Sequence, residues 1–278
     1  MQESKKTKVS VLMPAYNAEK YIKEAIESIL DQTFKDFEFI IIDDCSQDKT
    51  WEIIREYKER DNRIIIDKNQ KNLGLAGIRN KLKKMAKGEY IAWQDADDIS
   101  IETRLEKQYA FLESHPEVGI IGAYLEFFEN DYSAKSIRKY YRGDQKLRKN
   151  IFLFSPVAQP VAMIRKEILD RAGDYNLKYP PAEDLDMSFR IGKMSQFANI
   201  PEVLLRYREH PNSNTFTRLK KSERSTLEIR KKYANSAEYR ITLFDKVFNF
   251  LQRMTMYITP PKIRIWMFDL IRNSRIQK

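Results

Sequence analysis

The sequence predicts an α/β protein with a mostly parallel central sheet flanked by helices. Short apolar runs rich in β-branched residues occur at 9–13, 37–42, 64–66 and 90–93. Between these runs, apolar residues recur at helical spacing, at 21–30, 51–57 and 75–85. This alternation is typical of parallel strands that are joined by right-handed helical crossovers.

Local signals predict where the elements begin and end. Asn17 follows the first apolar run and is a favourable N-cap residue, so we expect the first helix to begin there. Further along, we expect a helix over 101–112 and a strand with a glycine-induced bend over 118–128. Residues 130–150 are polar, and they fit either a mobile segment over an acceptor site or an ordinary surface loop.

Composition limits the class of protein. The chain of 278 residues is 42% hydrophobic, which is enough for a sizeable core, and it has no low-complexity run. Its single cysteine, Cys45, excludes an intramolecular disulfide framework and suits a reducing, cytoplasmic compartment. Residues 1–8 show no signal-peptide pattern, and no run approaches the roughly 18 apolar residues of a membrane span.

The net charge of +10 is concentrated at one end of the chain. Residues 218–278 hold 15 of the 50 Lys and Arg but 5 of the 40 Asp and Glu, which leaves 35 of each sign in residues 1–217. The basic end also carries an apolar stripe over 241–258 and further apolar residues over 263–271. A basic amphipathic helical tail predicts peripheral contact with an anionic membrane surface, on the inner face of the cell membrane. Docking onto the rest of the chain and a subunit interface are the alternatives.

The strand predicted at 90–93 runs directly into Asp95-Ala96-Asp97-Asp98. Three carboxylates this close repel one another unless a cation lies between them. Mg²⁺ and Mn²⁺ prefer oxygen ligands, and Mg²⁺ commonly takes one or two carboxylates together with substrate phosphates. The stretch therefore fits a metal–diphosphate site, but it fits equally well an acidic turn in which Asp97, Asp98 or Ser100 caps the next helix.

Polar or conformationally special residues follow three of the predicted strands: Pro14-Ala15-Tyr16, Asp43-Asp44 and Asp95-Ala96-Asp97-Asp98. In parallel sheets, ligands bind beyond the carboxyl ends of the strands. We therefore expect these residues to lie together at one edge of the sheet.

Five blocks in order resemble the family-2 inverting glycosyltransferases with a GT-A fold: Pro14-Ala15-Tyr16-Asn17, Ile41-Ile42-Asp43-Asp44-Cys45-Ser46, Asn72-Leu73-Gly74, Ala76-Gly77-Ile78-Arg79-Asn80 and Asp95-Ala96-Asp97-Asp98. The resemblance covers about residues 8–213. One departure is Cys45, where the family usually has Gly, and we interpret it as a small turn residue.

The resemblance implies how the chain is divided. A GT-A catalytic domain would span 1–217, with a nucleotide-binding half over about 1–98 and an acceptor half over about 99–217. The helical C-terminal extension would span 218–278. The apolar segments 152–157 and 159–164 would belong to the acceptor half of the sheet.

The resemblance also assigns the nucleotide contacts. Pro14, Ala15 and Tyr16 would contact the nucleotide, with Tyr16 stacked on the base. For Tyr16, packing in the core is the alternative. Asp44 would accept a hydrogen bond from the uracil imide, because a carboxylate only accepts. Asp43 is interpreted as holding the turn.

Charged residues would hold the rest of the donor. Arg79 would reach the diphosphate, for which a guanidinium fork is suited, although a solvated helix face is the alternative. Asp95 would face the ribose and Asp97 would bind the metal ion. Asp98 would either ligate the metal or cap the next helix. His210 falls where relatives place a further metal or diphosphate contact.

A second acidic block, Glu183-Asp184-Leu185-Asp186, opens a predicted helix. Acids at a helix start usually only complement the helix dipole. The resemblance implies that Asp184 is the catalytic base, with Glu183 as the second candidate. The reaction requires such a group, because the acceptor hydroxyl must lose its proton as it attacks.

The implied function is a metal-dependent inverting glycosyltransferase. It would move a hexosyl or N-acetylhexosaminyl group from a nucleotide sugar, expected to be a UDP-sugar, to a glycan or lipid-linked acceptor in cell-surface polysaccharide synthesis. The expected cofactor is Mg²⁺ or Mn²⁺.

Two rival functions remain at this stage. One is a nucleotidyltransferase, against which the absence of a Gly-rich, Lys-bearing loop near the first strand argues. The other is a non-catalytic binder of membrane or nucleic acid through the basic tail. That binder would leave Asp44, Asp97 and Asp184 without a role, so no nucleic-acid partner is expected.

Overall fold

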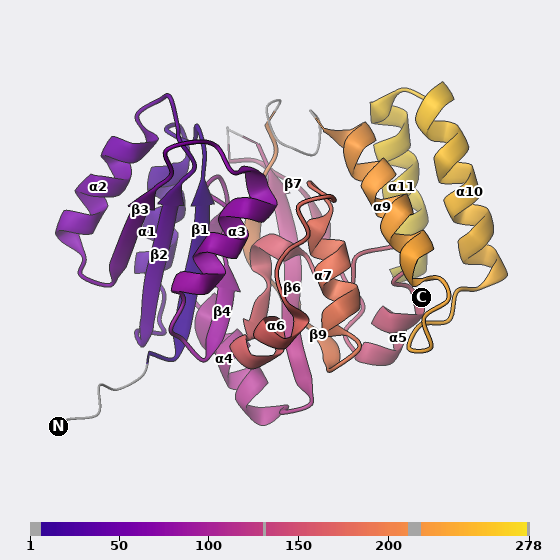
Figure 1. Ribbon diagram of the computed structural model, residues 1–278, viewed down its shortest axis with the longest axis horizontal. Coiled ribbons are helices and arrows are strands. Elements are labelled where there is room, and N and C mark those ends of the chain that lie inside the picture. The colour runs from indigo at the N-terminus through magenta and orange to yellow at the C-terminus, as the bar shows by residue number, and fades with distance from the viewer. Residues whose placement is uncertain (1–6, 130–131, 211–217, 277–278) are drawn as a thin grey trace.

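The computed structural model describes residues 7–129, 132–210 and 218–276 (Figure 1). Within these residues the chain forms a nine-stranded sheet in the order β3-β2-β1-β4-β8-β6-β9-β5, and β7 pairs with β6. The strands are β1 Val9–Ala15, β2 Phe37–Asp43, β3 Ile64–Lys68, β4 Tyr90–Trp93, β5 Ile99–Ser100, β6 Val118–Phe128, β7 Ala134–Arg138, β8 Met163–Arg165 and β9 Gln196–Arg208.

The first half is a parallel sheet covered by helices on both faces, as the sequence predicts. Strands β3, β2, β1 and β4 pair in parallel. Side chains alternate along β1, so Val11 packs in one apolar cluster with helices α1 and α2, and Leu12 packs in another with α3. These helices are α1 Ile22–Leu30, α2 Thr50–Arg60 and α3 Gly74–Met85. Because both faces are covered, the strands are mostly apolar, and the buried exceptions Ser10 and Glu38 hydrogen-bond to each other at 2.6 Å.

The start of the first helix differs from the sequence prediction. Helix α1 begins at Ile22, and Asn17 is not its cap. Asn17 lies in the left-handed region at φ 48°, and its side-chain oxygen accepts a hydrogen bond from the backbone N–H of Gln47 at 2.9 Å. Asn tolerates this conformation better than most residues, so it ties the loop after β1 to the loop after β2.

The second half mixes strand directions. Strand β8 pairs antiparallel with β4 and with β6, while β6 and β9 are parallel. Strand β6 has the predicted bounds, and residues 134–138 and 144–149 form β7 and α5 within the segment expected to be a loop or mobile. The remaining helices of this half are α4 Arg104–Ser114, α5 Asp144–Lys149, the 3₁₀ turn η1 Gln159–Val161, α6 Lys166–Ala172 and α7 Glu183–Ile191.

The expectation that 152–157 belong to the sheet is wrong, and of 159–164 only the end enters β8. Phe152 is fully buried against Phe189 of α7 and Tyr239, with ring centroids 5.4 and 6.4 Å apart. Packing between helices therefore explains the apolar character of this segment, which sequence periodicity cannot distinguish from that of a short strand.

Among the described residues from 218 onward, three helices lie at the side of the molecule opposite β3 (Figure 1). They are α9 Leu219–Tyr233, α10 Leu243–Ile258 and α11 Pro261–Ile276. Tyr233 of α9 stacks on Phe189 of α7, with ring centroids 4.5 Å apart. None of the described helices combines the length and apolar character needed to cross a membrane.

Candidate active site

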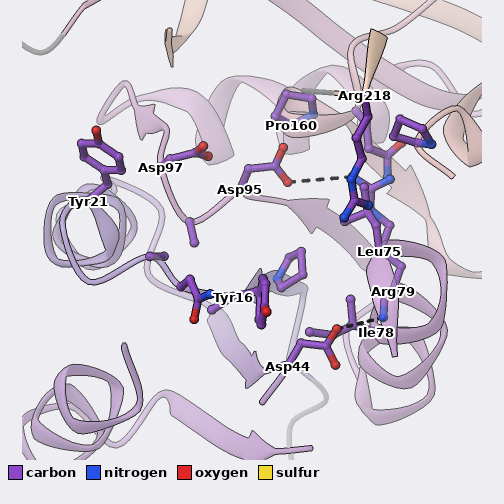
Figure 2. Close-up of a pocket in the computed structure, with 18 of the residues that line it drawn as sticks. Tyr16, Tyr21, Asp44, Leu75, Ile78, Arg79, Asp95, Asp97, Pro160 and Arg218 are labelled. Carbon is purple, nitrogen blue, oxygen red and sulfur yellow. Dashed lines mark hydrogen bonds and ion pairs between the residues drawn. The ribbon is translucent and has the colours of Figure 1, made fainter. Parts of the chain in front are cut away.

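The carboxyl ends of β1, β2 and β4 open into a pocket of about 710 Å³, together with the starts of α3, α7 and α9 (Figure 2). This volume lies in the usual range for small-molecule sites. Nine of the ten site residues predicted from the sequence line the pocket: Pro14, Ala15, Tyr16, Asp44, Arg79, Asp95, Asp97, Asp184 and His210. The expectation that the three strand ends meet at one edge is confirmed.

Asp44 is held by the loop between β3 and α3. Its Oδ1 accepts from the side-chain amide of Asn69 at 2.7 Å and from the N–H of Leu73 at 2.9 Å, and its Oδ2 accepts from the N–H of Gly74 at 3.0 Å. Gly74 adopts φ 70°, where a side chain would be strained. A carboxylate offers roughly four acceptor positions, so Oδ2 keeps one for a ligand N–H.

Tyr16 lies at the pocket with half of its surface (51%) exposed, so core packing is the wrong interpretation for it. Figure 2 shows Tyr16 and Asp44 on one side of the cavity, with Asp95 and Asp97 on the other. A planar ligand ring can therefore stack on Tyr16 while the remainder of the ligand extends toward the acids.

The turn after β2 explains the departure at Cys45. Cys45 adopts φ 67°, a conformation that favours Gly, and it lies in a bend of the chain. The buried carboxylate of Asp43 accepts from the N–H of Ser46 at 3.2 Å, which closes this bend as expected.

The acidic loop after β4 is anchored from behind by Arg104, which is fully buried. Its guanidinium donates to the carbonyl of Trp93 at 2.6 Å and to the side-chain oxygens of Gln94 and Ser100 at 2.9 and 2.8 Å. Gln94 in turn donates to the carbonyls of Asp95 and Asp98. The loop is therefore fixed by buried hydrogen bonds from Arg104 of α4 and from Gln94.

Neither open interpretation of Asp98 holds. Asp98 is fully buried, does not line the pocket, and accepts from the backbone N–H of Arg208 at 2.9 Å. Strand β5 follows it, and helix α4 begins only at Arg104, with Thr103 making no side-chain cap. The acidic turn therefore does not serve to cap a helix.

Asp97 and His210 approach each other from two segments of the chain. Nε2 of His210 lies 3.0 Å from Oδ2 of Asp97, and both residues line the pocket. The described residues contain no cluster of three or more His, Cys, Asp and Glu that could hold a metal ion unaided. One carboxylate and one imidazole fit an ion such as Mg²⁺ or Mn²⁺ that takes its other ligands from a bound diphosphate and water.

Arg79 connects the two acidic regions. It is buried, so the solvated helix face is the wrong interpretation. Its Nη1 donates to Glu183 Oε1 at 2.5 Å, and its Nη2 lies 3.8 Å from Asp95 Oδ1. Burial alone would lower the pKa of Arg79, but the charges of Glu183 and Asp95 outweigh it and raise that pKa.

The two neighbouring acids at the start of α7 have different environments. Glu183 is fully buried against Arg79 and does not line the pocket. Asp184 lies on the pocket wall, where burial raises its pKa to about 6. The charge of Glu183 adds to this shift and that of Arg79 opposes it. A carboxylate with a pKa near 6 is suited to accept a proton near neutral pH.

Some pocket residues were missed from the sequence. Arg218 (Figure 2) and Ser222, at the start of α9, line the pocket, although the sequence assigns both to the tail. Arg104 was missed because an arginine within a helix normally indicates a solvated face. Its place eleven residues after Trp93, whose carbonyl it binds, gives no sequence signal.

Comparison with known proteins identifies the class. Residues 10–173 match the family described as "Glycosyl transferase family 2", and the chain belongs to this family. It is 39% identical over 225 residues to an uncharacterized glycosyltransferase of Methanocaldococcus jannaschii, MJ1057, covering 80% of this chain and 77% of that one. It is 32% identical over 243 residues to UDP-Glc:alpha-D-GlcNAc-diphosphoundecaprenol beta-1,3-glucosyltransferase WfaP of Escherichia coli, covering 84% and 89%.

Solved structures agree on the fold. TarS of S. aureus, residues 1–349 in complex with UDP-GlcNAc, aligns with a TM-score of 0.69 at 22% identity, over 83% of this chain and 67% of that one. The mannosyltransferase PcManGT of Pyrobaculum calidifontis, in complex with GDP-Man and Mn²⁺, aligns with a TM-score of 0.65 at 15% identity, over 96% and 74%. The protein is a glycosyltransferase with a GT-A fold and a helical C-terminal extension.

Proposed function

We propose that the protein is a metal-dependent inverting glycosyltransferase. It transfers a hexose or N-acetylhexosamine from a UDP-sugar to a hydroxyl of a glycan or lipid-linked acceptor, in cell-surface polysaccharide synthesis. The observation that carries the proposal is that Asp97, in the loop after β4, and Asp184, in the first turn of α7, line one pocket with Tyr16 and Asp44. WfaP, which is named for a UDP-Glc donor and a diphosphoundecaprenol-linked acceptor, supports the choice of donor and acceptor.

The nucleotide binds at the β1 and β2 side of the pocket. Tyr16 stacks on the base, and the open acceptor position of Asp44 Oδ2 receives the imide N–H of uracil. Pro14 and Ala15 form the floor at the end of β1, and Asp95 faces the ribose.

Asp97 and His210 are the residues that would hold a divalent cation, Mg²⁺ or Mn²⁺. When bound there, the ion would supply positive charge against the leaving diphosphate. The Mn²⁺ in the complex of PcManGT supports this assignment. Arg79 adds a fixed positive charge on the same wall, and Glu183 positions it, so Glu183 is a positioning residue and not the base.

Asp184 is the base. It takes the proton of the acceptor hydroxyl as that oxygen forms a bond to the anomeric carbon, and the bond from the anomeric carbon to the diphosphate oxygen breaks with its electron pair leaving on the diphosphate. Attack from the face opposite the diphosphate inverts the anomeric centre. No covalent enzyme intermediate is required.

The test is release of nucleoside diphosphate from a panel of nucleotide sugars, with and without Mn²⁺. We expect metal-dependent release of UDP that Asp97→Ala abolishes, and an inverted anomeric configuration in the product by NMR. Release of pyrophosphate would indicate a nucleotidyltransferase. Binding without any release would indicate a non-catalytic protein.

The location of the protein is also a proposal. We place the protein in the cytoplasm, in peripheral contact with the inner face of the cell membrane, where a lipid-linked acceptor is presented. The basic character of residues 218–278 supports this contact.

A further inference from the structure

Helix α10 turns several polar side chains toward the protein, beside Phe248 and the buried Met256, and most of its large apolar side chains outward. Asn249 and Gln252 accept hydrogen bonds from Nη1 of the buried Arg230 at 2.8 and 2.9 Å, and Asp245 is buried. The exposed side carries Leu243, Phe244, Val247, Phe250, Leu251, Met254, Tyr257 and Ile258. A helix that only covers a core has the opposite arrangement.

Helix α11 has the same inverted arrangement. Arg264 donates to Glu223 at 2.9 Å on its inner side, and Arg272 donates to the carbonyl of Lys139 at 3.2 Å while covering the ring of Tyr140. Its exposed apolar residues are Ile263, Trp266, Met267 and Leu270.

The two apolar sides both point away from the catalytic body. Phe248 of α10 and Phe268 of α11 both pack on Phe154, with ring centroids 6.5 and 5.4 Å apart. The exposed residues occupy the other sides of the two helices, and we call them together the α10–α11 face. Exposed apolar patches of this kind mark contact with a membrane or another protein.

The charged residues of α10 and α11 indicate what kind of partner binds the α10–α11 face. Lys246 and Arg253 are exposed on α10, each four residues before an exposed aromatic residue, Phe250 and Tyr257. The only acidic residue of α11, Asp269, pairs with Arg138 at 3.2 Å. The face therefore offers positive charge and apolar side chains without a free acid.

We infer that the α10–α11 face lies in the interface of an anionic lipid bilayer, with its aromatic and aliphatic side chains at the level of the headgroups. A second copy of this chain is a poorer partner, because it would bring the same basic residues face to face. The inference rests on the proposed membrane contact and names the surface that makes it. Helix α9 packs between α7 and α10 (Figure 1), so the helix whose first turn lines the pocket is held next to the lipid.

The test uses the full chain and the double variant Phe250→Glu/Trp266→Glu, whose two side chains are 62% and 63% exposed. The matched control is Leu177→Glu, at an equally exposed apolar residue (68%) that lies outside these helices. Flotation is measured with vesicles of phosphatidylcholine containing phosphatidylglycerol and with vesicles of phosphatidylcholine alone. We expect the wild type and the control to float with the anionic vesicles, and the double variant to lose about tenfold in partitioning for each substitution.

The variant Lys246→Ala tests the contribution of positive charge. We expect it to weaken binding to anionic vesicles about fivefold at low salt and to leave binding to neutral vesicles unchanged. The inference is overturned if the wild type does not bind anionic vesicles or if the double variant binds as well as the wild type. It is also overturned if sedimentation shows a wild-type dimer that the double variant converts to a monomer.

Thermal unfolding and UDP-sugar hydrolysis without vesicles are measured on every variant. Equal melting temperatures show that the variants are folded. Absence of hydrolysis in the wild type would contradict the proposed reaction and leave the vesicle result to decide the membrane inference by itself.

Discussion

At the scale of single residues, the site depends on different environments for two adjacent acids. Glu183 and Asp184 follow each other at the start of α7, yet Glu183 is buried in an ion pair with Arg79 and Asp184 faces the pocket. Burial raises the pKa of Asp184, the charge of Glu183 adds to that rise, and Arg79 limits it. Glu183 thus holds Arg79 in position and helps to set the pKa of Asp184.

Asp184→Asn is expected to lower the turnover number about 10²- to 10⁴-fold, which is the usual contribution of a general base. The wild-type rate should rise with pH and level off above a pKa of about 6, because only ionised Asp184 accepts a proton. Since burial raises this pKa above the unfolded value, the ionised form costs stability above pH 6. The variant should therefore melt no lower than the wild type at pH 8.

The matched control is Asp174→Asn, an exposed acid that does not line the pocket. Kinetics and thermal unfolding are measured on both variants across pH. If the rate of Asp184→Asn still falls below about pH 6, or if that variant is fully active, Asp184 is not the base.

Glu183→Gln tests the positioning role. It leaves buried Arg79 without its hydrogen-bonded partner and with only the more distant negative charges of Asp95 and Asp184, and breaking a buried ion pair typically costs about 3–5 kcal/mol. We expect a lower urea midpoint and weaker UDP binding, with the pH limb shifted to lower pH because the neighbouring negative charge is gone. If Glu183 were the base, the pH limb would disappear instead.

At the scale of elements, the acidic loop after β4 is held in shape by helix α4. No pattern in the sequence predicts this contact. Arg104 of α4 reaches behind the loop to Trp93, Gln94 and Ser100. Burial lowers the pKa of Arg104 to about 9, while the charges of Asp98 and Asp95 oppose this shift. The strand presents the acids, and the helix fixes their orientation.

Arg104→Met should destabilise the protein by about 3 kcal/mol or more, because several buried acceptors lose their donor. We also expect it to reduce the rise in melting temperature that UDP and Mn²⁺ give the wild type, since Asp97 is no longer held in place. Arg55→Met, at an exposed position of α2, is the control and should behave as the wild type. A variant that is destabilised but binds UDP and Mn²⁺ normally would show that the loop is fixed by other contacts.

Elements with a regular pattern could be predicted from the sequence, and those shaped by tertiary contacts could not. The parallel half and the gathering of Tyr16, Asp44 and Asp97 follow from strand patterns and from the rule for ligands at strand ends. Asn17 looked like a cap because its bond to the loop after β2 depends on a distant segment. Residues 152–157 looked like a strand because an apolar run is the same whether sheet or helices bury it.

At the scale of the whole molecule, the C-terminal extension is not separate from the catalytic body. Ile229, Tyr233 and Tyr239 belong to the apolar cluster that contains Phe189 of α7, and Arg218 lines the pocket. The division at residue 217 stays a prediction. We propose instead that the catalytic unit continues to about residue 240, and that only α10 and α11 form the attached membrane unit.

Truncated chains can decide whether the catalytic unit ends at residue 217 or at about residue 240. A chain of residues 1–217 loses the rings of Tyr233 and Tyr239, which lie 4.5 and 4.9 Å from that of Phe189, whereas a chain of residues 1–240 keeps both. Removing a large core side chain costs about 3–5 kcal/mol, and two such losses approach the entire 5–15 kcal/mol of a typical domain. We therefore expect 1–240 to unfold cooperatively and bind UDP, and 1–217 to aggregate or melt far lower in differential scanning calorimetry. Equal melting temperatures for the two chains would place the boundary at 217. They would show that α9 adds no stability to the catalytic unit despite its contacts with α7.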